Sequence, residues 1–276
     1  MREDRFRDVR VEALKMLAEH HVKRPEDIDL DAIAESMDAT ITYDDLDGAT
    51  ARVMRLGSRA TIRISNRIQE VGARRSASAH EIGHLRLGHE VPTGDSDHIV
   101  ERICKPLAAD HRISERAASV FSSELVMPEP LVQPRCRVSC VTLDPVREIA
   151  REFTTSVLAS AMRFIELSSE RCAVAYSVLG RVHWLKPSAT FPNWVPRGRR
   201  LDPASAASEY YEGGTIDNAP RVLTADIWLP PDFIDGSQCQ IVEHSAAIPE
   251  LGAVLSLLWI PEREAHHLDL ESHASV

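Results

Sequence analysis

The chain has 276 residues, of which 43% are hydrophobic and 27% charged, so it can bury a sizeable core and is neither disordered nor collagen-like. Its formal net charge of −10 and its aromatic content of 5% argue against nucleic-acid binding through general electrostatics or base stacking. At about 150 residues per domain, this length predicts roughly two domains.

The N-terminal part of the chain combines helical and strand patterns. Apolar residues recur at helical spacing over residues 5–20, Pro25 interrupts this pattern, and residues 27–37 predict a second, short helix. Three short runs with alternating apolar residues, separated by the turn pairs Asp47-Gly48 and Gly57-Ser58, then predict a small antiparallel sheet. These runs are residues 39–43, 50–56 and 60–64.

Helical patterns dominate the middle of the chain. Residues 73–90 fit one long helix, and a second helix over residues 114–126 ends where Met127-Pro128 begins. Two more helices are expected over residues 143–153 and 156–168, in the manner of a helix-turn-helix.

After residue 170 the pattern changes to strands. Gly180 separates two runs like the turn of a hairpin, whereas residues 187–218 show few signs of regular structure. The expected strands are residues 172–178, 181–185, 222–229, 238–244 and 253–260. The composition shifts near residue 130 and near residue 170, which predicts three parts: residues 1–130, 131–170 and 171–276.

The sequence predicts a cytoplasmic protein. The apolar run at residues 251–260 is shorter than the about 20 residues that a membrane span needs, and the charged N-terminus has no apolar stretch of the kind found in signal peptides. The five cysteines include no Cys-x-x-Cys pair, so we interpret them as free structural thiols in a reducing compartment.

The strongest functional signal is His80-Glu81-Ile82-Gly83-His84, a His-Glu-x-x-His motif on a predicted helix. Residues four positions apart share one face of a helix, so both imidazoles can bind the same metal ion. Glu81 can then reach a water molecule at the metal as a general base, and two imidazoles with one carboxylate suit Zn²⁺. The alternative interpretation is a helix with two exposed histidines and an ordinary glutamate.

A third metal ligand has to come from further along the chain. The metzincin pattern fails, because Leu87 and Glu90 stand where that pattern needs Gly and His. A carboxylate on the following helix is the alternative, and we favour Glu115 over Glu124, which we interpret as a solvated surface charge. Three histidines could replace Glu115 as a ligand: His89, His98 and His111.

Taken as a pair, the two helices resemble the motifs of the ImmA/IrrE metallopeptidases. The downstream helix reads Glu115-Arg-Ala-Ala118-Ser-Val-Phe121-Ser-Ser-Glu-Leu125-Val-Met127-Pro128, where the family has Glu-x-x-Ala-Asn-x-Phe-Ala-x-x-Leu-Leu-Met-Pro. The likeness covers residues 8–170 in arrangement. Two positions depart from the pattern, because Ser119 replaces the usual Asn and Ser122 the usual Ala; the Ser119 hydroxyl could still serve as a hydrogen-bond partner behind the ligands.

The resemblance implies a zinc-dependent endopeptidase of α+β fold. By position, His80, His84 and Glu115 would bind one Zn²⁺ per chain, with Mn²⁺ as the alternative metal, and Glu81 would be the catalytic base. The implied partner is a protein substrate, a helix-turn-helix transcriptional repressor whose cleavage switches on a stress-response or mobile-element operon.

The resemblance also assigns a character to each part of the chain. Residues 1–130 are expected to form a helical, zincin-like metallopeptidase domain with the small sheet, and residues 131–170 a helical segment like a helix-turn-helix. Residues 171–276 are expected to form a β-rich α+β domain, GAF-like and suspected of sensing as in the radiation-response branch of the family. No motif in the sequence identifies a ligand for that domain.

Two other classes of function remain open on the sequence alone. One is a DNA-binding regulator that places a recognition helix from residues 142–167 in the major groove. Residues 156–169 contain a single basic residue, Arg163, so we favour a packed helical pair and expect neither direct nucleic-acid binding nor membrane association. The other is a ligand-sensing regulator or scaffold in which the metal is structural or absent.

Overall fold

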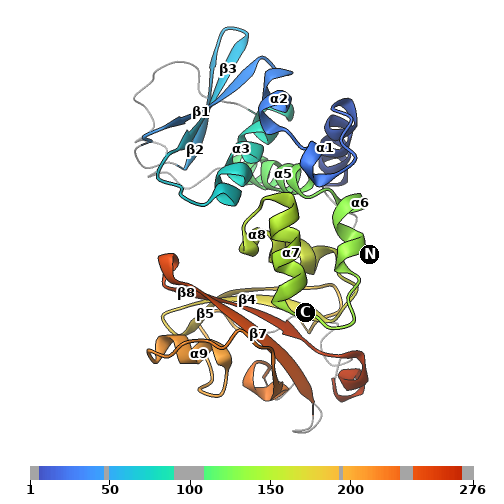
Figure 1. The fold of residues 1–276 in the computed structure, drawn as a ribbon, viewed down its shortest axis with the longest axis vertical. Coiled ribbons are helices and arrows are strands. Elements are labelled where there is room, and N and C mark those ends of the chain that lie inside the picture. The colour runs from blue at the N-terminus through green and yellow to red at the C-terminus, as the bar shows by residue number, and fades with distance from the viewer. Residues whose placement is uncertain (1–5, 47–49, 90–108, 193–194, 231–238, 269–276) are drawn as a thin grey trace. The chain divides into compact units, whose positions relative to one another are not determined.

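A computed structural model describes residues 6–46, 50–89, 109–192, 195–230 and 239–268 of the chain (Figure 1). The chain divides into two compact units. The first holds Met1–Leu131 and Ala150–Ser156, and the second holds Val132–Ile149 and Val157–Val276. Within the described ranges, no helix is both long and apolar enough to cross a lipid bilayer.

Helices provide most of the core of the first unit. Helices α1 (Arg7–Glu19) and α3 (Val71–Arg86) both pack against α5 (Ala109–Val126), and α2 (Leu30–Glu35) packs against α3 (Figure 1). Many of the apolar residues that repeat at helical spacing are buried in this unit. They include Met16, Ile33, Ile82, Phe121 and Leu125.

The ends of two helices in this unit are set by local groups. A 3-10 turn at Pro25–Asp27 precedes α2, and Asp29 then caps α2 because its carboxylate accepts the backbone N–H groups of Asp31 and Ala32. Helix α3 stops at Arg86, short of its predicted end, because Gly88 adopts a left-handed φ of +66°.

The small sheet of the first unit has the strand order β1-β3-β2. Strands β2 (Ala51–Leu56) and β3 (Arg59–Ser65) form the predicted antiparallel hairpin, but β1 (Ala39–Asp44) runs parallel to β3. The sheet is therefore mixed, which corrects the prediction of a wholly antiparallel sheet. Turn residues specify how successive strands pair, and β1 instead occupies the far edge of β3, a choice that no local signal encodes.

The second unit is built on a five-stranded antiparallel sheet of order β5-β4-β8-β7-β6. Its strands are β4 (Cys172–Val178), β5 (Arg181–Pro187), β6 (Arg221–Thr224), β7 (Gln240–Ile248) and β8 (Ala253–Trp259). Every strand region predicted after residue 170 overlaps one of these strands. The chain is thus an α+β protein with a β-rich C-terminal region, as predicted, while the GAF-like character of that region stays a prediction.

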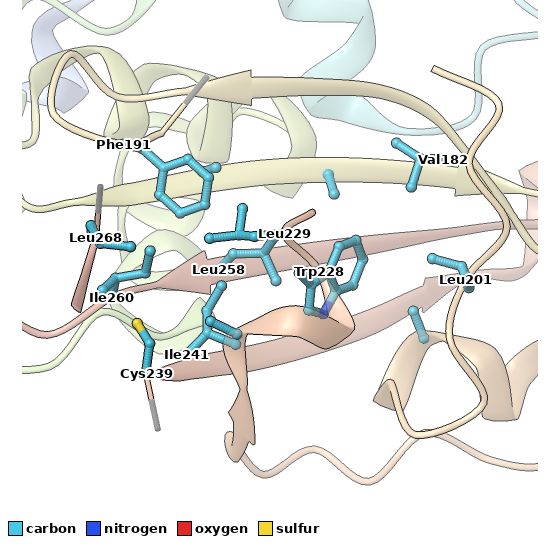
Figure 2. Packing of buried hydrophobic residues seen from close by; sticks show 14 of the residues in the cluster. Val182, Phe191, Leu201, Trp228, Leu229, Cys239, Ile241, Leu258, Ile260 and Leu268 are labelled. Atoms are coloured by element: carbon cyan, nitrogen blue, oxygen red, sulfur yellow. The ribbon is translucent and has the colours of Figure 1, made fainter. Parts of the chain in front are cut away.

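One face of this sheet carries an apolar core that includes Trp228, Phe191 and Leu258 (Figure 2). The run predicted as a strand over residues 222–229 ends early, because Ala225–Ile227 forms a 3-10 turn that carries Trp228 into this core. The guanidinium group of Arg199 holds the turn, donating hydrogen bonds to backbone carbonyl groups in it.

A buried glutamate organises the next part of the same core. Helix α9 (Ala206–Tyr211) lies in a stretch where the sequence predicted little regular structure. The carboxylate of Glu243 on β7 is fully buried and accepts the first two backbone N–H groups of α9, at 3.1 and 2.9 Å. It also accepts the indole N–H of Trp228 at 3.0 Å and the hydroxyl of Ser245 at 2.6 Å. Four donors therefore saturate this carboxylate.

Helices α7 (Leu143–Phe153) and α8 (Val157–Leu167) occur where the sequence predicted a helical pair. Helix α8 packs against β4 and β5 of the second unit. Its basic residue, Arg163, is only 1% exposed, so it does not reach a DNA phosphate from this position. A recognition helix has to present polar and basic side chains to the major groove, and α8 uses this face for packing.

Candidate metal centre

The close approach of α3 and α5 brings the predicted site residues together. A side chain at Gly83 would place its Cβ 3.2 Å from the carbonyl oxygen of Ala118 and equally close to the ring of Phe121. The absence of that side chain lets the two helices pack closely. Ile82, on the opposite side of the motif, is fully buried and fixes the rotation of α3 about its axis.

Three side chains converge between these helices. The Nε2 atoms of His80 and His84 lie 3.1 Å apart. The carboxylate of Glu115 on α5 contacts both, with Oε2 at 3.2 Å from His80 Nε2 and Oε1 at 3.3 Å from His84 Nε2. Within the described residues, these three form the group whose ligand atoms could hold one metal ion.

The spacing of these atoms fits a zinc ion. Nitrogen and oxygen ligands that surround zinc tetrahedrally at about 2.0–2.1 Å lie about 3.3 Å from one another, close to the three separations observed here. Two Nε2 atoms at 3.1 Å can share one proton between them, so at least one imidazole lone pair faces the centre of the group. The donor set therefore suits a divalent cation.

The group is open to solvent on one side. The side chain of Glu115 is 41% exposed, while those of His80 and His84 are 25% and 12% exposed. A structural zinc site is closed by four protein ligands, whereas a catalytic site has three and leaves one position for water or substrate. Three converging side chains with a partly exposed carboxylate match the catalytic pattern.

Glu81 lies beside this group and is held by the small sheet. The backbone N–H of Val53 on β2 donates a hydrogen bond to the Glu81 carboxylate. Burial, together with the nearby negative charge of Glu115, raises the pKa of Glu81 to about 7 despite that hydrogen bond. The carboxyl group is therefore oriented and close to the site, as a proton acceptor must be.

Glu124 lies nine residues after Glu115 and belongs to a different environment. It was predicted to be a solvated surface charge, and this is wrong, because its side chain is fully buried. Its carboxylate accepts the backbone N–H of Glu129 at 2.7 Å, at the start of the short helix α6 (Glu129–Val132), and lies 3.6 Å from Arg10. Its position at the exit of α5 made it look exposed in the sequence, but α1 supplies Arg10 to pair with it.

The other candidates from the sequence do not join the group in the described part of the chain. The hydroxyl of Ser119 donates to the backbone carbonyl of Glu115 at 2.8 Å and not to its carboxylate. The ring of His89 contacts His84 on Nδ1, the nitrogen that faces away from the group. His98 and the side chain of His111 lie outside the described residues.

Two contributors to the site were missed from the sequence. The N–H group of Val53 carries no sequence signal, because it depends on β2 passing beside α3. Gly88 could have been found, since glycine directly after a helical pattern is a common C-terminal signal. Its left-handed conformation turns the chain back toward the site and brings His89 against His84.

Comparisons with known proteins give a family match and a similar fold. Residues 34–164 match the family model of the M78 peptidases, described as the IrrE N-terminal-like domain. A solved structure named as a Mycobacterium tuberculosis transcriptional regulator has the same fold, with a TM-score of 0.57 at 15% sequence identity, over 98% of this chain and 94% of that one. No curated protein sequence matches the chain significantly. Residues 34–164, which contain α3 and α5, are therefore an IrrE N-terminal-like domain of the M78 peptidase family.

Proposed function

We propose that this protein is a zinc-dependent endopeptidase with His80, His84 and Glu115 as metal ligands and Glu81 as the general base. The observation that carries the proposal is the convergence of the three ligand atoms at 3.1–3.3 Å beside the oriented Glu81 carboxylate. Mn²⁺ is the alternative metal, because imidazole and carboxylate ligands also accept it.

A bound zinc ion would supply Lewis acidity, which activates water and polarises a peptide carbonyl. The residues of the chain would then move the proton. Glu81 would accept it from the attacking water as the new C–O bond forms, and would deliver it to the amine nitrogen as the C–N bond breaks. The hydrogen bond from the N–H of Val53 would restrain the Glu81 carboxylate.

The substrate in this proposal is a helix-turn-helix transcriptional repressor, whose cleavage switches on a stress-response or mobile-element operon. The family resemblance supports a regulatory peptidase with a narrow substrate range. We further propose residues 1–130 as the peptidase domain, residues 131–170 as a helical connector and residues 171–276 as a sensory domain. A cytoplasmic location is supported by the free thiols at Cys136, Cys140, Cys172 and Cys239, which suit a reducing compartment.

Metal content is the first test. Purified wild type is expected to hold close to one zinc per chain, whereas Glu115→Gln should bind zinc at least about tenfold more weakly. Glu35→Gln, a change to an exposed glutamate at the end of α2, is the matched control and should behave as wild type. Wild-type protein that neither holds nor takes up zinc or manganese would overturn the proposal.

Proteolysis is tested by comparing wild type with Glu81→Gln in producing cells, using a proteome-wide survey of newly formed protein N-termini. New termini on one or a few DNA-binding repressors should appear with wild type, and loss of the base should slow their formation by about 10²–10⁴-fold. Zinc content should be unchanged in the variant. Equal cleavage by both forms would remove Glu81 from the mechanism, and rapid digestion of casein would contradict a narrow substrate range.

A further inference from the structure

The C-terminus of α3 is closed by a specific backbone motif. The N–H of Gly88 donates to the carbonyl of Leu85 at 3.2 Å, and the N–H of His89 donates to the carbonyl of His84 at 3.0 Å. This pair of bonds, with glycine at a φ of +66°, is a Schellman motif. In that motif the residue after the glycine folds back over the residue five positions earlier, so His89 is placed directly against His84.

The side chains of His84 and His89 are in direct contact. Nδ1 of His89 lies 3.1 Å from Nδ1 of His84, and the ring centroids are 5.0 Å apart at an interplanar angle of 73°. A hydrophobic contact commonly accompanies this motif, but here two imidazoles meet through their nitrogen atoms. One of the two nitrogens must therefore carry the proton.

Metal binding at Nε2 of His84 determines which of the two Nδ1 atoms carries the shared proton. If Nε2 of His84 gives its lone pair to a metal ion, the neutral ring keeps its proton on Nδ1. That Nδ1–H can donate only to an unprotonated Nδ1 of His89, which leaves the His89 proton on Nε2. Ligating histidines nearly always donate their second N–H group to an acceptor, which fixes the tautomer and orients the ring.

We propose that His89 is a positioning residue: as a neutral imidazole it accepts the Nδ1–H of His84 and so holds Nε2 of His84 toward the metal ion. The proposal rests on the metal site of the proposed function and assigns His89 a role outside the ligand set. Nδ1 of His89 contacts Nδ1 of His84, whereas Nε2 of His84 faces the other ligands. His89 therefore supports the ligand His84 and does not replace it.

The test is a competition titration of zinc against a chromophoric chelator, with the full chain. His89→Ala removes the acceptor and should weaken zinc binding by about 10–100-fold. His89→Asn should restore affinity to within about threefold of wild type, because the amide oxygen occupies nearly the position of Nδ1 and accepts a hydrogen bond. His183→Ala, a change to an exposed histidine on β5, is the matched control.

A second readout reports the hydrogen bond itself. In nuclear magnetic resonance spectra of protein labelled with ¹⁵N-histidine, zinc-loaded wild type should show the Nδ1–H tautomer for His84 and the Nε2–H tautomer for His89. In His89→Ala the Nδ1 proton of His84 should lose its hydrogen-bonded shift, whereas His89→Asn should keep it.

The outcomes separate this inference from the function on which it rests. Wild type that binds no zinc defeats both. Wild type that binds zinc while His89→Ala binds equally well overturns the positioning role alone. Equal weakening in His89→Ala and His89→Asn also overturns it, because the effect then comes from packing of the ring and not from the acceptor.

Discussion

Two acidic centres of this protein show opposite surroundings. In the second unit, the buried carboxylate of Glu243 is met by four hydrogen-bond donors from α9, Trp228 and Ser245. In the first unit, the carboxylate of Glu115 is partly exposed and meets the Nε2 atoms of two histidines, which themselves lie in contact. The fold therefore supplies hydrogen-bond donors to the Glu243 carboxylate. Around Glu115, by contrast, carboxylate and imidazole atoms that can bind a metal ion converge on one position.

The difference separates a structural carboxylate from a functional one. A buried carboxylate is stable when protein donors satisfy it, so Glu243 needs no further partner and fixes the start of α9. Imidazole and carboxylate ligand atoms that converge on one position favour a cation, and this position remains accessible because one side of the group is open to solvent. Exposure and partner type, rather than the presence of a glutamate, therefore distinguish the two centres.

The largest effect on stability is expected at the saturated centre. Replacing Glu243 with alanine leaves four buried donors without their acceptor and should lower the free energy of unfolding by about 3–5 kcal/mol. All four tryptophans lie after residue 180, so denaturant unfolding followed by tryptophan fluorescence reports on this unit.

Glu250→Ala, at an exposed glutamate before β8, is the control for that change and should leave the transition within about 0.5 kcal/mol of wild type. Zinc content in native buffer should be unchanged in Glu243→Ala. If both glutamate variants unfold alike, the network around Glu243 contributes no stability and the contrast between the two centres fails.

Removing the metal from the group formed by His80, His84 and Glu115 should have the next largest effect on the free energy of unfolding. With free zinc at about 100 times its dissociation constant, a chelator should lower stability by about 2.7 kcal/mol. Far-ultraviolet circular dichroism follows the helices that hold the ligands, and tryptophan fluorescence follows the second unit. We expect the circular dichroism transition to shift more than the fluorescence transition. A chelator that moves neither transition would show that the centre binds no metal in the folded protein.

The smallest effect on stability should come from Gly83→Ala. The added methyl group would lie 3.2 Å from Ala118 and Phe121, so α5 has to move by a few tenths of an ångström. Alanine also favours the helix by about 1 kcal/mol, so the net change in unfolding free energy should stay within about 1 kcal/mol. Zinc affinity should nevertheless fall several-fold, because the shift moves Glu115 away from the histidines.

Gly72→Ala is a useful companion on the same helix. There the new Cβ would lie 2.4 Å from the backbone of Thr155, which cannot move as a side chain can, so stability should fall further than in Gly83→Ala. Because Gly72 lies about two turns of α3 away from His80, we expect the folded Gly72→Ala protein to bind zinc with wild-type affinity. Loss of affinity in Gly72→Ala but not in Gly83→Ala would reverse the assignment of Gly83 to the site.

Local patterns were enough to predict most elements of this fold. Helix α7 begins and ends where helical spacing predicted, and Gly180 marked the β4–β5 hairpin. The His-Glu-x-x-His motif placed both histidines on one helix face, and the family pattern pointed to Glu115, which the structure brings within 3.3 Å of them.

What escaped prediction depends on partners distant in sequence. The burial of Glu124 depends on Arg10, and α9 depends on the carboxylate of Glu243 more than 30 residues later. The parallel pairing of β1 with β3 is likewise a choice between two sheet edges. Propensity and spacing describe neighbours along the chain, so such contacts cannot be inferred from them.

The distance of Glu115 from the motif also has a consequence for the order of assembly. His80 and Glu115 are 35 residues apart, so the pair of histidines on α3 is synthesised and can become helical well before α5 docks. Until then an ion would meet two imidazoles alone, and a complete site rarely exists before folding. Metal capture should therefore be a late event in the maturation of the chain, and a ribosome-bound fragment ending before α5 should fail to retain zinc.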